Sequence, residues 1–170
     1  GTPMNSPKSH KPFRPLTTFS FRLDQQLHGL DPLGYPVVNG LVHAVVSVLF
    51  MELSQLFLVR TESVLFSGLC FAAHPIHTEA VTGVVGRCEV FAALFFLLSF
   101  LAYHRACAPH RTSRSMGAWA FCSCCMCAVG MLCKEPCIMV LALNGAYDAW
   151  MILHVWMKKK EMPSLAGIAA

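Results

Sequence analysis

Apolar segments long enough to cross a lipid bilayer dominate this sequence. The first covers the 24 positions 36–59, and about 20 apolar residues in a helix cross the roughly 30 Å hydrocarbon core. Hydrophobic residues make up 55% of the 170 residues and charged residues only 13%, against about 25% charged residues in soluble domains. A helix satisfies its own backbone polar groups inside lipid. The sequence therefore predicts an all-α, polytopic transmembrane helical bundle.

We expect about five membrane-spanning helices joined by short loops. The domain 36–157 holds the expected spans, about residues 36–59, 60–77, 78–103, 116–133 and 136–157. Residues 1–35 are expected to form a polar loop that includes an interfacial amphipathic helix from about Leu16 to Leu30. Residues 158–170 are expected to be a cytoplasmic tail or a truncated loop. The chain starts at Gly1, inside a polar and proline-rich stretch, so we expect a fragment of a longer protein.

Positive charges are divided unequally between the two sets of loops. Seven cations lie on one set and two, Arg87 and Lys134, lie on the short loops of the other. The cation-rich side of a membrane protein faces the cytoplasm. We therefore expect the N-terminal loop, the segment from His74 to Arg87 and the Lys134-Glu135 turn to share the luminal side. The seven cations are Arg60, Arg105, Arg111, Arg114, Lys158, Lys159 and Lys160.

The segment from His74 to Arg87 concentrates ionisable side chains inside this apolar chain. Such groups are costly at membrane depth and indicate a functional site. If the segment begins the third span as one continuous helix, Glu79, Gly83 and Arg87 recur every four residues and share one face. Two interpretations are open: a structural polar patch between helices, or a polar pocket that opens to water. The convergence of three polar features on one side favours the pocket.

Neither a disulfide framework nor a metal site is indicated by the nine cysteines. Four of them crowd into an uncharged run, Cys122, Cys124, Cys125 and Cys127, without the two separated Cys-x-x-Cys pairs of a zinc ribbon. They are expected to be small apolar residues buried in the membrane. The basic segment with His10, Lys11 and Arg14 has two interpretations, a phosphate-binding loop or a loop that meets lipid head groups.

Three stretches carry a resemblance to a known family. They are Ser9-His10-Lys11-Pro12-Phe13-Arg14-Pro15-Leu16-Thr17, His74-Pro75-Ile76-His77-Thr78-Glu79-Ala80-Val81 with Gly86-Arg87, and Leu132-Cys133-Lys134-Glu135. With these stretches in the same order as in the family, the chain up to about Trp156 resembles the transmembrane and tetratricopeptide-repeat O-mannosyltransferases (TMTC). That family is similar to the GT-C glycosyltransferases, which are many-spanning proteins of the endoplasmic reticulum membrane with a luminal active site.

The resemblance implies a transferase that uses dolichyl-phosphate mannose as its donor. Mannose would move to Ser or Thr hydroxyls of secretory-pathway proteins such as cadherins, and tetratricopeptide repeats would lie outside this fragment. The resemblance also implies that the catalytic acidic residues precede Gly1, so we expect the fragment alone to be inactive. Membrane lipids are expected partners and nucleic acid is not. No metal ligand is proposed, and dependence on a divalent metal is left open.

Residue chemistry assigns roles within that framework. A lipid phosphate leaving group needs cations to offset its developing charge, and we assign this role to His10, Lys11, Arg14 and Arg87. An acceptor hydroxyl needs a nearby base. The pocket candidates with that chemistry are Glu79, His74 and His77.

Two alternatives to an enzyme remain. A non-enzymatic scaffold of the endoplasmic reticulum membrane, such as a partner of a calcium-handling protein, would use the polar segment for helix packing alone. An acidic pair just before Gly1 would favour the enzyme over this scaffold. A transporter is the weaker option, since the sequence has no evident inverted repeat.

Overall fold

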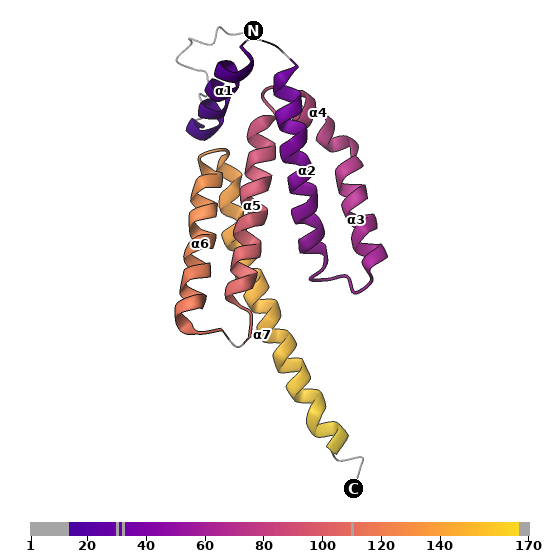
Figure 1. The fold of residues 1–170 in the computed structure, drawn as a ribbon. Coiled ribbons are helices and arrows are strands. Elements are labelled where there is room, and N and C mark those ends of the chain that lie inside the picture. Colours follow the sequence, from indigo (N-terminus) through magenta and orange to yellow (C-terminus); the bar gives the residue numbers. More distant parts are fainter. Residues whose placement is uncertain (1–13, 30, 32, 110, 167–170) are drawn as a thin grey trace, which may run out of the picture.

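The computed structural model describes residues 14–29, 31, 33–109 and 111–166. Over these residues the chain is helical and contains no strand, which confirms the predicted all-α fold (Figure 1). Proline stands in the first turn of α1, η1 and η2, where its missing N–H costs no helical hydrogen bond. The elements are α1 (Pro15–His28), α2 (Gly34–Ser54), α3 (Thr61–Ala73), η1 (Pro75–His77), α4 (Thr78–Thr82), α5 (Arg87–Ala106), α6 (Ser113–Met131), η2 (Glu135–Ile138) and α7 (Met139–Ala166).

Helix α5 lies at the centre of the bundle, between α2 and α6 (Figure 1). Helices α1 and α4 lie at one end, together with the connection from α6 to α7; we call this the α1 end. The α2–α3 and α5–α6 connections lie at the opposite end, the turn end, beyond which α7 continues away from the bundle. The first part of α7 packs on α5, whereas Ile152, Val155 and Trp156 further along are exposed.

Three segments are long and apolar enough to cross a membrane: Gly34–Ser54, Arg87–Ala106 and Glu135–Lys159. Helix α3 has 13 residues, so it reaches only about 20 Å, and α6 is not among the three candidates. The chain is thus an all-α membrane bundle with at least these candidate spans. The number of five spans stays a prediction, because α3 and α6 would have to supply the other two and neither is among the candidates.

The core forms where α5 meets its neighbours. One cluster joins Phe100 of α5 to Cys127 of α6 and to Val140 and Tyr147 of α7, and all four are buried. A second cluster joins Val90 and Leu97 on another side of α5 to Val46 of α2. Between α5 and α6 the buried Ser99 hydroxyl donates to the Ser123 carbonyl oxygen at 2.9 Å. This bond satisfies a polar group at membrane depth, as expected between transmembrane helices.

The prediction of one continuous helix from residue 78 to 103 is wrong. Helix α4 ends at Thr82 and α5 begins at Arg87, with an extended Gly83 (ψ 136°) between them. A Cβ at Gly86 would lie 2.7 Å from the carbonyl carbon of Ala80, and still nearer to its oxygen. The two glycines thus allow the chain to fold back closely on α4, and the helical spacing of Glu79 and Arg87 does not apply.

We expect Gly86→Ala to destabilise the fold by about 1–3 kcal/mol, because the added methyl group meets backbone atoms that cannot rotate away. The measurement is thermal unfolding of the purified chain in detergent micelles. Gly117→Ala is the matched control, since a Cβ there meets nothing within 4 Å and alanine favours a helix more than glycine does. Equal melting temperatures for the two variants would contradict the close approach at Gly86.

Candidate functional site

Charged groups from three distant parts of the chain meet at the α1 end. Lys134, in the connection before η2, donates a hydrogen bond to the Glu89 carboxylate in the first turn of α5. Arg14, just before α1, lies 3.7 Å from the Glu135 carboxylate, measured from Nη2 to Oε2. The same guanidinium donates to Cys88 Sγ at 3.1 Å through Nη1. Arg14, the first turn of α5 and the Lys134-Glu135 turn therefore lie together at one end of the bundle.

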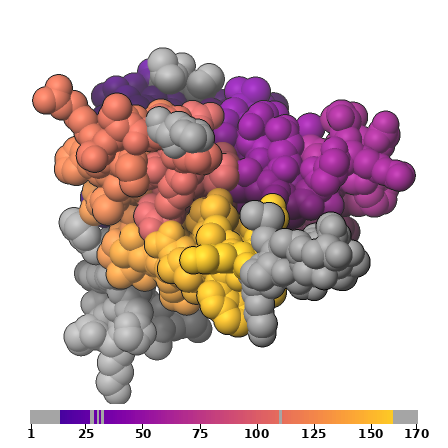
Figure 2. Space-filling view, turned by 90° about the horizontal axis from the view of Figure 1, so that it is seen from below, coloured from indigo at the N-terminus to yellow at the C-terminus, as the bar shows by residue number. Residues whose placement is uncertain are grey.

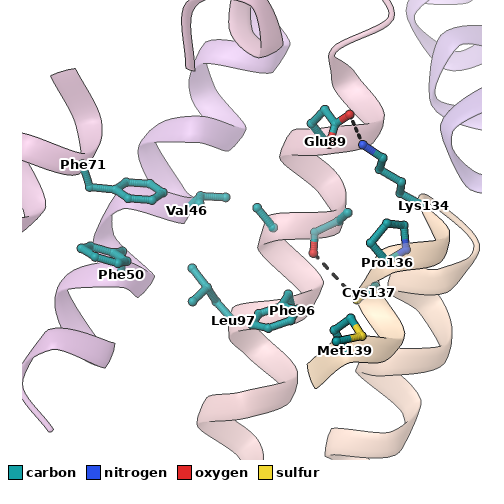
Figure 3. Close-up of a pocket in the computed structure, with 12 residues that line it drawn as sticks. Val46, Phe50, Phe71, Glu89, Phe96, Leu97, Lys134, Pro136, Cys137 and Met139 are labelled. Carbon is teal, nitrogen blue, oxygen red and sulfur yellow. Dashed lines mark hydrogen bonds and ion pairs between the residues drawn. The ribbon is translucent and has the colours of Figure 1, made fainter. Parts of the chain in front are cut away.

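An apolar cavity of about 450 Å³ lies directly below this group of charges (Figure 3). Its walls come from α2 and α3 on one side, from α5 behind, and from η2 and the start of α7 on the other. Glu89 and Lys134 stand at one end of it, and they are its only charged lining groups among the described residues. The principal apolar lining residues are Val46, Phe50, Phe71, Phe96, Leu97 and Met139.

A second, more polar cavity of about 700 Å³ adjoins the first. It is lined by η1, α4, the Gly83–Gly86 connection and the first turns of α5, and it contains His77, Glu79 and Glu89. Glu89 and Ala93 line both cavities. We call these the apolar cavity and the polar cavity, and Glu89 marks the point where they meet.

Histidine and glutamate side chains give the polar cavity its chemistry. The His77 ring centroid lies 4.8 Å from that of His43 and 6.2 Å from that of His74. His77 lies outside the three candidate spans, and burial, followed by the nearby His43 and His74, lowers its pKa below the ordinary value. A neutral imidazole at pH 7 is able to accept a proton or a hydrogen bond. Glu79 is exposed and lines the same cavity.

Arg87 faces away from both cavities. Its side chain is 1% exposed and forms an ion pair with Asp24 of α1. Nε donates to Asn39 Oδ1 at 2.8 Å, Nη2 donates to the Tyr35 carbonyl oxygen at 3.2 Å, and the guanidinium carbon lies 4.8 Å from the Phe21 ring centroid. This arrangement joins α5 to α1 and α2. A phosphate contact by Arg87 stays a prediction, and it would require the guanidinium to leave Asp24.

The remaining predicted residues divide into two groups. His74, His77 and Glu79 lie close together, and His74 Nδ1 accepts a hydrogen bond from the Ile76 N–H at 3.2 Å. Arg14 lies at the α1 end near Glu135, whereas His10 and Lys11 lie outside the described residues. Over the part of the chain that the structure describes, no group of three or more His, Cys, Asp or Glu side chains is arranged to hold a metal ion.

Comparison with known proteins decides the family. The family model described as dolichyl-phosphate-mannose-protein mannosyltransferase matches residues 11–170. The chain belongs to this mannosyltransferase family. It is 45% identical to protein O-mannosyl-transferase tmtc2 of Xenopus laevis over 150 residues, which are 88% of this chain and 18% of that protein. It is 45% identical to TMTC3 of Homo sapiens over 152 residues, 88% of this chain and 16% of that protein.

The similarity extends over nearly the whole chain in a further relative. TMTC2 of Homo sapiens is 42% identical over 165 residues, covering 97% of this chain and 20% of that protein. The chain therefore spans about a fifth of the length of the curated mannosyltransferases it matches. No solved structure matches it. These findings support the family that the three sequence motifs indicate.

Proposed function

We propose that this chain forms the donor-binding part of a protein O-mannosyltransferase, which moves mannose from dolichyl-phosphate mannose to Ser or Thr hydroxyls. One observation carries the proposal: an apolar cavity ends at a lysine and adjoins a polar cavity with acid–base side chains. A lipid-linked sugar has the same sequence of parts, an apolar chain, a phosphate and a sugar. Each part therefore meets a surface of matching chemistry.

In this proposal the isoprenoid chain lies in the apolar cavity and its phosphate contacts Lys134. The Lys134 and Glu89 side chains are 25% and 48% exposed. Ion pairs this exposed contribute only about 0–1 kcal/mol, so a phosphate can replace Glu89 as the partner of Lys134. Arg14 supplies a second cation at the same end. Lys134 is thus more available to a phosphate than Arg87, which is buried and paired with Asp24.

The mannose and the acceptor hydroxyl meet in the polar cavity. The hydroxyl oxygen attacks C1 of mannose, the bond from C1 to the phosphate oxygen breaks, and dolichyl phosphate leaves with the bonding electron pair. A base takes the hydroxyl proton. His77, Glu79 and Glu89 lie there to orient the sugar, while the resemblance assigns the base itself to acidic residues before Gly1. Cations near the phosphate stabilise the charge that develops on it.

We further propose that the α1 end faces the lumen of the endoplasmic reticulum and that cadherin-type proteins are the acceptors. The support for the orientation is the excess of arginine and lysine in the loops of the turn end and in the last part of α7, because cation-rich segments stay in the cytoplasm. The acceptor class rests on the resemblance alone.

Photocrosslinking tests the donor site. A dolichyl-phosphate analogue with a photoreactive group on its isoprenoid chain should label Phe50, Phe71, Phe96 or Met139, which line the apolar cavity. Excess dolichyl phosphate should suppress the labelling strongly, and dolichol without the phosphate should suppress it less, because it lacks the contact with Lys134. Labelling confined to other helices, or equal competition by both lipids, would refute the proposed site and favour the scaffold alternative.

A further inference from the structure

A second group of cations lies at the turn end, far from the candidate donor site, and the proposed transferase chemistry does not use it. Figure 2 views the molecule from this end, where α5 and α6 (salmon) lie beside α2 (purple). The guanidinium carbon of Arg105, in the last turn of α5, lies 5.4 Å from the Trp119 ring centroid. That of Arg111, in the α5–α6 connection, lies 5.6 Å from the same centroid. Both distances are within the range of cation–π contacts.

The described partners of these two guanidiniums are neutral groups. Among the described residues, neither Arg105 nor Arg111 forms an ion pair with a carboxylate. Arg111 Nη1 donates one hydrogen bond, to Ser115 Oγ at 3.2 Å, and both arginines are exposed. Two positive charges that gather at one ring repel each other, so the site favours an anion. Guanidinium groups bind phosphate oxygens with short, charge-assisted hydrogen bonds.

An amphipathic cavity opens beside the same tryptophan. It has a volume of about 470 Å³, and Arg105 and Trp119 are among its lining residues. Leu49, Leu98 and Leu101 give it an apolar wall, and Glu52 of α2 also lines it. The two arginines and this one carboxylate leave one net positive charge, which matches the one negative charge of a phosphodiester. Tryptophan is also typical of the level at which lipid head groups lie.

We propose that this cavity binds an anionic phospholipid of the bilayer leaflet at the turn end. The phosphodiester contacts the guanidiniums of Arg105 and Arg111, and the upper part of one acyl chain lies against Leu49, Leu98 and Leu101. A headgroup that adds a quaternary ammonium is disfavoured, because the added cation would lie close to the arginines. The cavity therefore selects phosphatidylglycerol-like lipids over phosphatidylcholine.

Native mass spectrometry of the purified chain in detergent tests the site with two lipids that carry the same acyl chains. Dioleoyl phosphatidylglycerol should bind about tenfold more tightly than dioleoyl phosphatidylcholine. Arg105→Gln and Arg111→Gln should each lower the phosphatidylglycerol affinity about tenfold, since each removes a charge-assisted hydrogen bond to the phosphate. Neither change should alter binding of the photoreactive dolichyl phosphate at the α1 end.

Arg114→Gln is the matched control, because it removes the same charge from the start of α6, where Arg114 is exposed and is not among the described arginines that lie over the Trp119 ring. It should leave the affinity within about twofold of the parent value, as expected for an isolated surface charge. Arg111 lies in an exposed connection, so Arg111→Gln keeps the test decisive if Arg105→Gln misfolds. Equal affinity for the two lipids, or equal losses in all three variants, would refute the proposal.

Discussion

Arg87→Met should destabilise the bundle by about 3–5 kcal/mol, the usual cost of removing one partner from a buried ion pair. Arg87 is 1% exposed and the Asp24 side chain is 9% exposed, so the substitution leaves a buried carboxylate without its counter-charge. It also leaves Asn39 Oδ1 without its donor. Unfolding in detergent with increasing denaturant would measure the loss. Arg60→Met, at an exposed arginine in the α2–α3 connection, should change stability by less than about 0.5 kcal/mol.

The double variant Asp24→Asn/Arg87→Met separates a structural role of Arg87 from a role in catalysis. Removing both charges should recover part of the stability lost in the single variant, because no unpaired charge remains. If this folded double variant in the full-length protein still transfers mannose, Arg87 is not the phosphate ligand that the sequence suggests. A double variant less stable than Arg87→Met would contradict the ion pair as the source of the loss.

The fold class could be predicted from the sequence because it depends on the length and the polarity of segments. Residues 36–59 were expected to form the first span, and α2 covers Gly34–Ser54. The expected helix of Leu16–Leu30 corresponds to α1 (Pro15–His28), although its position at a membrane interface stays a prediction. Both segments have local signals, a proline near the start and a polar break at the end, that need no knowledge of tertiary structure.

The arrangement of the candidate site could be predicted only in part. Sequence spacing places Glu79 and Arg87 on one helical face, but the close approach of Gly86 to Ala80 breaks that helix. Because the helix is broken there, Glu79 lines the polar cavity, whereas Arg87 contacts Asp24 and Asn39. Gly83 and Gly86 are visible in the sequence, but the sequence alone does not show that they allow a turn of the chain back onto α4.

Glu89 and Lys134 were missed as site residues, although Lys134 stands in one of the three motifs. The two residues are 45 positions apart, and their contact depends on how η2 packs against α5. The apolar cavity likewise depends on the gap between α2, α3 and η2. The hydrophobic periodicity of a single sequence does not predict a cavity that forms between helices distant in the chain. The available signal was the motif Leu132-Cys133-Lys134-Glu135, which placed a cation on the same side as the His74–Arg87 segment.

Lys134→Gln should lower kcat for mannose transfer about 10²- to 10³-fold in the full-length protein, the usual effect of removing one group that stabilises developing negative charge. The loss should fall mainly on kcat, because the isoprenoid chain still binds the apolar cavity, so KM for dolichyl-phosphate mannose should change little. Transfer to an acceptor peptide at a series of donor concentrations would measure both constants. Lys134→Arg keeps the charge and should retain much of the activity.

If the loss of activity were caused by a damaged fold, Lys134→Gln would also unfold much more easily than the parent. We expect only a small change in stability. The Lys134–Glu89 pair is partly exposed, so its removal should cost about 1 kcal/mol or less, and Lys134→Gln should unfold within a few degrees of the parent. Glu89→Gln removes the same ion pair and keeps the lysine for the phosphate, so its kcat should exceed that of Lys134→Gln. Lys158→Gln, at an exposed lysine on α7, should leave transfer unchanged. If Lys134→Gln transfers mannose as fast as the parent, the phosphate does not lie at Lys134, and the donor site must be sought elsewhere in the bundle.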